Sequence, residues 1–86
     1  MRVSEYEVTT ALKKLKNRIA SRNERHGDQP HFSRHESVAI CDEEMTEIKL
    51  AVHAKASDQE LADEYLDLAC AALWAFLSVD KYQGSK

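Results

Sequence analysis

Apolar residues recur along this chain at the three- and four-residue spacing that is typical of α-helices. A first stripe consists of Val8, Leu12, Leu15 and Ile19. A second stripe consists of Val38, Cys41, Met45, Ile48 and Val52. A third run, from Leu66 to Leu77, is apolar or small at every position except Asp67. Because no alternating strand pattern and no repeat is visible, the sequence predicts an all-α fold.

A helix-start signal precedes each of these segments. It is the capping box, in which a serine hydroxyl binds a backbone N–H and a glutamate three residues later binds the serine's own N–H. The three pairs are Ser4 with Glu7, Ser33 with Glu36, and Ser57 with Glu60. We therefore expect helices over about 5–25, 34–54 and 58–79 in a single domain, 1–86. The stretch HGDQPHF, 26–32, is the expected loop, and the short link at 55–57 predicts an antiparallel helical hairpin.

Composition adds limits on size and partners. A chain of 86 residues with 43% hydrophobic content makes one small domain, and we expect further copies to cover part of its apolar surface as a homodimer or homotetramer. The net charge of −3 and the pI of about 5.8 disfavour nucleic-acid binding. We interpret the basic residues of the first helix as a solvated face: Lys13, Lys14, Lys16, Arg18, Arg22 and Arg25.

Location and redox state follow from similar considerations. The sequence shows no secretory signal, and its longest apolar run is too short to span a bilayer. We therefore expect a cytoplasmic protein with no membrane partner. The two cysteines, Cys41 and Cys70, fall on apolar helix faces, and we interpret them as reduced core residues.

Asp67 raises the question of a partner, because a carboxylate among apolar neighbours needs a compensating group. Residues equidistant from the turn of a helical hairpin lie at the same height, so Glu44 should face Asp67 and Glu47 should face Glu64. Four converging carboxylates require a cation or shared protons. Oxygen ligands without histidine or cysteine favour Mg²⁺ or Mn²⁺, and the Glu-x-x-His pair of di-iron bundles is absent.

These acids also form a recognisable pair of motifs. Glu43-Glu44-Met45-Thr46-Glu47 and Glu64-Tyr65-Leu66-Asp67 resemble the EExxE and ExxD motifs of the MazG-like, all-α nucleotide pyrophosphohydrolases, over roughly residues 32–80. The resemblance implies a three-helix MazG-like bundle that hydrolyses nucleoside triphosphates to the monophosphate and pyrophosphate with Mg²⁺. It also implies that Glu44, Glu47, Glu64 and Asp67 are the metal ligands, and that Glu43 has an outer-shell or water-orienting catalytic role.

The predicted loop and the helix ends carry the candidate substrate contacts. His31 and Phe32 are candidates to stack on a base, and Arg34 and His35 are candidates to contact phosphate, although ordinary loop composition also explains them. Lys81 and Tyr82, just past the expected third helix, are further candidates to contact phosphate or sugar. Members of the family usually continue into another helix, whose basic residues help to close the site. Two alternatives stay open for this chain: a second subunit supplies that wall of the site, or efficient turnover is lost. The alternative function is a small, non-catalytic helical interaction or regulatory protein.

Overall fold

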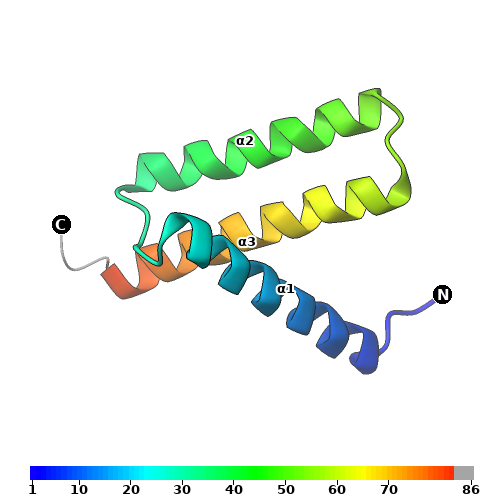
Figure 1. The fold of residues 1–86 in the computed structure, drawn as a ribbon, viewed down its shortest axis with the longest axis horizontal. Helices are drawn as coiled ribbons and strands as arrows, with labels where there is room; N and C mark the ends of the chain where they lie inside the picture. Colours follow the sequence, from blue (N-terminus) through cyan, green and yellow to red (C-terminus); the bar gives the residue numbers. More distant parts are fainter. Residues whose placement is uncertain (83–86) are drawn as a thin grey trace.

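The computed structural model describes residues 1–82, with side chains as far as Asp80. It contains three helices: α1 (Glu5–His26), α2 (Arg34–His53) and α3 (Asp58–Tyr82) (Figure 1). Within these residues there is no β-strand. The predicted all-α class with three helices is therefore confirmed, while the MazG-like architecture and the oligomeric assembly stay predictions.

The helices begin where the serines predict. Ser4 and Glu7 form the complete capping box, with the Ser4 N–H donating to Glu7 (2.9 Å) and the Glu7 N–H donating to the Ser4 hydroxyl (3.1 Å). Ser57 and Glu60 exchange the same two bonds. At α2 the Ser33 hydroxyl accepts from the Glu36 N–H, but the Glu36 carboxylate accepts from the N–H of Phe32 rather than from that of Ser33. Each helix thus starts at a locally encoded cap.

The turn between α2 and α3 is tight. Lys55 has a φ of 56°, in the left-handed region. The Lys55 N–H donates to the carbonyl of Val52 (3.1 Å), and the Ala56 N–H donates to that of Ala51 (3.0 Å). This pair of bonds is the Schellman arrangement that ends a helix and reverses the chain. As a result, α2 and α3 lie side by side and antiparallel, as predicted (Figure 1).

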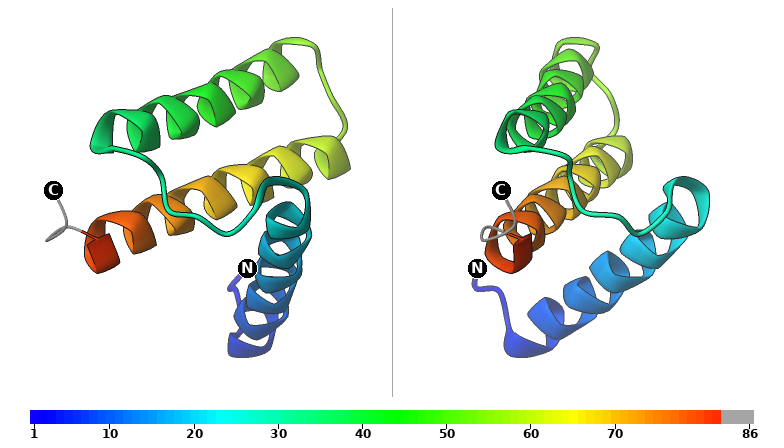
Figure 2. Two further views of the ribbon diagram at one scale, coloured as in Figure 1. Left: turned by 60° about the vertical axis from the view of Figure 1, so that its left-hand side comes forward. Right: turned by 90° about the vertical axis from the view of Figure 1, so that its left-hand side faces the viewer.

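The first helix packs against α3, which also packs against α2, so that α3 is the central helix (Figure 2). The loop after α1 is fixed to α3 by two hydrogen bonds. The Trp74 indole N–H donates to the carbonyl of Gln29 (2.8 Å), and the His31 N–H donates to the Ser78 hydroxyl (2.9 Å). The His31 ring also bonds to the Ser37 hydroxyl near the start of α2 (2.7 Å). These contacts place the C-terminal end of α1 against the hairpin.

The buried core of the single chain is small. Among the described residues the buried apolar side chains are Ile48, Cys70 and Ala71. The predicted stripe of α1 is not buried as a unit, because Val8 is 48% and Leu12 is 58% exposed and no residue of α1 is buried. The ends of the α2 stripe, Val38 and Val52, are exposed as well. Cys70 is a buried free thiol as expected, whereas Cys41 is half-buried.

No helix in the described part of the chain combines the length and the apolar composition that crossing a bilayer requires.

Candidate metal centre

Three acids of the two motifs meet between α2 and α3. One carboxylate oxygen from each of Glu44, Glu47 and Glu64 lies within 4.8 Å of the other two. Glu44 and Glu47 are one helical turn apart on α2, and Glu64 reaches them from α3 because the tight turn sets the height of one helix against the other. Glu44 and Glu64 are half-buried and Glu47 is exposed. We call these three residues the glutamate cluster.

The electrostatics of the glutamate cluster are unfavourable when all three groups are charged. Burial, together with the nearby carboxylates of Glu47, Asp67 and Glu64, raises the pKa of Glu44 from 4.5 to about 7. Burial and the charges of Glu47 and Asp67 also raise the pKa of Glu64. Oε2 of Glu44 and Oε2 of Glu64 are buried and have no hydrogen-bond partner. Such buried oxygens call for a proton or a cation.

Asp67 has a partner that the sequence did not indicate. Its Oδ1 accepts a hydrogen bond from Nη1 of Arg18 in α1 at 2.5 Å, and Nη2 of the same arginine lies 3.5 Å from Asp63. The bond to Asp67 is the main reason that the pKa of Arg18 is raised. Asp67 lies close enough to the glutamate cluster to act on it electrostatically, but its oxygens do not complete the group of three. Its role as a metal ligand stays a prediction.

The structure does not bring the predicted substrate contacts whose side chains it describes into the glutamate cluster. His31 is half-buried and bonded to Ser78 and Ser37, so it holds the loop in place, and burial lowers the pKa of its ring. Phe32, at 92% exposed, lies open to solvent. Arg34 and His35 are exposed in the first turn of α2, and Glu43 is exposed further along it. Lys81 lies in the last turn of α3, and its side chain is outside the described residues, as is that of Tyr82.

The basic face of α1 takes a position that the sequence analysis missed. The interpretation of all its residues as solvated is wrong for Arg18 and Arg22, which are half-buried. The guanidinium carbon of Arg22 lies 5.4 Å from the centre of the Trp74 ring, within the range of a cation–π contact. The signal was present in the sequence, since Arg18, Arg22 and Arg25 recur at four- and three-residue steps that place them on one helix face.

Comparisons of the chain with protein families, with characterised proteins and with solved structures found no match. The resemblance to MazG-like proteins therefore stays a prediction from the two acidic motifs.

Proposed function

We propose that this chain is a Mg²⁺-dependent nucleoside triphosphate pyrophosphohydrolase that releases the nucleoside monophosphate and pyrophosphate. The observation that carries the proposal is the glutamate cluster, in which Glu44, Glu47 and Glu64 offer oxygens within 4.8 Å of one another. The acids come from the positions that the EExxE and ExxD motifs assign to metal ligands.

The residues fit a hard divalent cation. The donors are carboxylate oxygens, which Mg²⁺ and Mn²⁺ prefer. Two of them, one on Glu44 and one on Glu64, are buried without a hydrogen-bond partner. Among the described residues, no lysine or arginine forms an ion pair with the glutamate cluster. A bound divalent ion would thus satisfy both the charge and the open oxygens.

The division of roles follows from these positions. Glu44, Glu47 and Glu64 would hold Mg²⁺, with Asp67 as the predicted fourth ligand. The chemistry that Mg²⁺ supplies in such a site is neutralisation of phosphate charge and a lowered pKa of water. Glu43 is exposed and one residue from the cluster, which suits the predicted outer-shell role of orienting water for attack on phosphorus. The protein contributes placement of the acids at the interface of two helices.

The test is pyrophosphate release from each nucleoside triphosphate and deoxynucleoside triphosphate with Mg²⁺, Mn²⁺ or Ca²⁺. We expect release with Mg²⁺ or Mn²⁺, and a loss of at least about 100-fold in Glu47→Gln and in Glu64→Gln, because each removes a charged ligand. Asp42→Asn is the matched control, since it removes one exposed carboxylate from the same helix outside the cluster. Absence of release with every metal and nucleotide, or unchanged release in both glutamine variants, would refute the proposal.

We also propose that the chain assembles as a homodimer or homotetramer. Large apolar side chains are exposed on all three helices, including Leu12, Leu50 and Phe76. Exposed apolar surface on this scale around so small a core is typical of an interface. The cytoplasmic location predicted above agrees with a nucleotide substrate.

The same exposed side chains support the second candidate function, a small non-catalytic interaction protein. In that case the hairpin would pack on a different protein, and its acids would pair with that partner's arginines or lysines. The two candidates differ in their response to metal. An interaction protein would show no change in thermal unfolding with millimolar Mg²⁺ or Mn²⁺, whereas the enzyme would be stabilised by either ion.

A further inference from the structure

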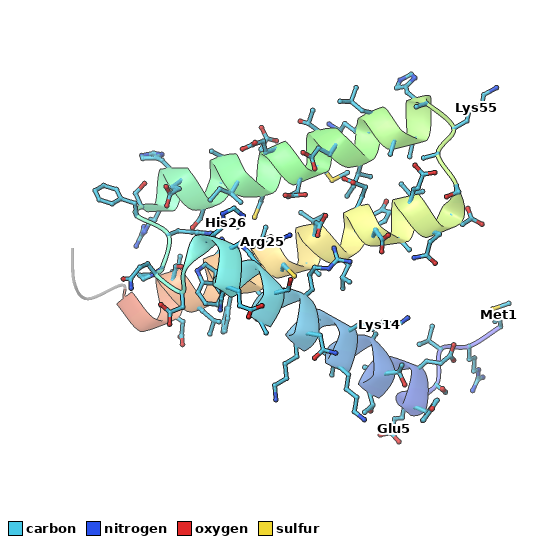
Figure 3. All side chains as sticks on the ribbon, in the orientation of Figure 1. Met1, Glu5, Lys14, Arg25, His26 and Lys55 are labelled. Carbon is cyan, nitrogen blue, oxygen red and sulfur yellow. The ribbon has the colours of Figure 1, made fainter. Side chains whose placement is uncertain are left out.

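A pocket of about 200 Å³ lies between the C-terminal half of α1 and the hairpin. One wall consists of Arg18, Arg22, Arg25 and His26 of α1, and the opposite wall includes Glu44 and Asp67. Figure 3 shows Arg25 and His26 at the end of α1 that meets the hairpin, with Lys14 further toward the helix's N-terminal half. The pocket thus has a basic wall and an acidic wall, and the acidic wall borders the glutamate cluster.

The basic wall carries positive charge that no carboxylate among the described residues fully neutralises. Arg18 is paired with Asp67 and Asp63. Arg22 has no carboxylate partner among the described residues, and contacts Trp74 and, at 3.4 Å, the side-chain oxygen of Asn23. Arg25 forms no ion pair within the same part of the chain. Two guanidinium groups therefore remain able to bind an anion from outside.

The chemistry of the pocket selects a phosphate group. Guanidinium groups bind phosphate oxygens through paired, charge-assisted hydrogen bonds. The volume of about 200 Å³ is below the roughly 300–1,000 Å³ of pockets that enclose whole small molecules, so it suits part of a ligand. A ligand that meets both walls must present negative charge to the arginines while sharing a divalent cation with the acids. A di- or triphosphate chain does both.

We propose that this pocket is the phosphate-chain subsite of the protein, that Arg22 and Arg25 are its phosphate-binding residues, and that Arg18 is a positioning residue that holds Asp67. The inference rests on the proposed function for the identity of the whole substrate, but the subsite binds a phosphate chain whether or not hydrolysis follows. The cationic contacts then come from the first helix, and Arg34 and His35 at the start of α2 are not needed for them.

The experiment measures binding of inorganic tripolyphosphate by titration calorimetry, without metal and with Mg²⁺, to the wild-type chain and to Arg22→Gln/Arg25→Gln. We expect the double variant to bind about tenfold more weakly or worse, because charge-assisted hydrogen bonds are lost. The matched control is Lys14→Gln/Lys16→Gln, which removes two exposed charges of α1 outside the pocket. We expect less than about a threefold loss there, through the general field alone.

Equal losses in the two double variants, or no tripolyphosphate binding by the wild-type chain, would overturn the subsite. Arg25→Gln alone guards against misfolding of the double variant, because Arg25 forms no ion pair in the described structure. Arg25→Gln must by itself weaken tripolyphosphate binding by more than Lys14→Gln/Lys16→Gln does. If it does not, the proposal is also overturned. For hydrolysis, the arginine variants should raise KM.

Failure of the proposed function gives a different pattern. If the wild-type chain binds tripolyphosphate through Arg22 and Arg25 yet releases no pyrophosphate from any nucleotide, the hydrolase assignment is wrong and the subsite stands. If the chain hydrolyses nucleotides and Arg22→Gln/Arg25→Gln leaves KM unchanged, the subsite is wrong and the hydrolase assignment stands.

Discussion

Replacing Glu44 by glutamine should stabilise the metal-free protein, and only above a certain pH. The folded state raises the pKa of Glu44 from 4.5 to about 7, so it holds the proton more tightly than the unfolded chain does. Below about pH 4.5 Glu44 is protonated in both states, so it does not lower the free energy of unfolding. As the pH rises from about 4.5 to about 7, the folded state is progressively destabilised relative to the unfolded chain, and the full destabilisation is present above about pH 7. Glutamine has the same shape without the charge.

The magnitude follows from the size of the shift. A pKa difference of about 2.5, at about 1.4 kcal/mol for each pKa unit, sets an upper limit of about 3.5 kcal/mol. Because Glu44 is half-buried and water screens part of the repulsion, we expect a gain of about 1–2 kcal/mol near pH 8 and close to none near pH 4.

The assay is urea unfolding followed by circular dichroism with a chelator present, for wild type and Glu44→Gln at both pH values. Glu43→Gln is the control, because it removes the neighbouring but exposed carboxylate and should change stability by less than about 0.5 kcal/mol. A Glu44→Gln variant that is less stable near pH 8, or equally shifted at both pH values, would refute the electrostatic reasoning. Mg²⁺ at tenfold its Kd should add about 1.4 kcal/mol to the wild type and much less to the variant.

Three further predictions concern the remaining contacts. Arg18→Gln should lower the free energy of unfolding by about 1–2 kcal/mol, because it leaves Asp67 unpaired beside other carboxylates. A double-mutant cycle with Asp67→Asn, measured by urea unfolding, should show a coupling of at least about 1 kcal/mol. Zero coupling would contradict the ion pair. Ser78→Ala removes the acceptor of the His31 N–H, so hydrogen exchange at that amide should accelerate at least about tenfold, and unchanged exchange would contradict the tether. Leu12→Glu places a charge on an exposed apolar position of α1 and should shift sedimentation from oligomer to monomer, whereas a monomeric wild type at micromolar concentration would exclude the proposed assembly.

The parts of the structure that the sequence predicted are those encoded over short distances. The caps at Ser4 and Ser57 involve residues three positions apart, so their bonds follow from the local pattern. The meeting of Glu47 with Glu64 needs only two regular helices and a short turn of fixed geometry. Both features depend only on the regular rise and rotation of a helix and on residues close in sequence. They can therefore be predicted without knowledge of the rest of the fold.

The parts that were missed depend on how α1 sits against the hairpin. The bond between Arg18 and Asp67 joins residues 49 positions apart, and the angle of α1 is set by a loop whose path depends on bonds to Trp74 and Ser78. No periodicity encodes that angle. Burial of the apolar stripe of α1 could not be predicted for the same reason. Its spacing shows that Val8 and Leu12 share a helix face, but it does not show whether another part of the chain covers that face.

The arrangement of the helices also has a consequence for the order in which the protein forms and opens. The hairpin of α2 and α3 is made of contacts close in sequence, which form quickly, whereas α1 joins through distant contacts with α3 alone. We therefore expect the hairpin to fold first and α1 to dock last. Since the least extensively packed element opens most readily, α1 should also be the first to detach under native conditions. The glutamate cluster would then be complete before Arg18 arrives, and brief departures of α1 would uncover Asp67 without unfolding the hairpin.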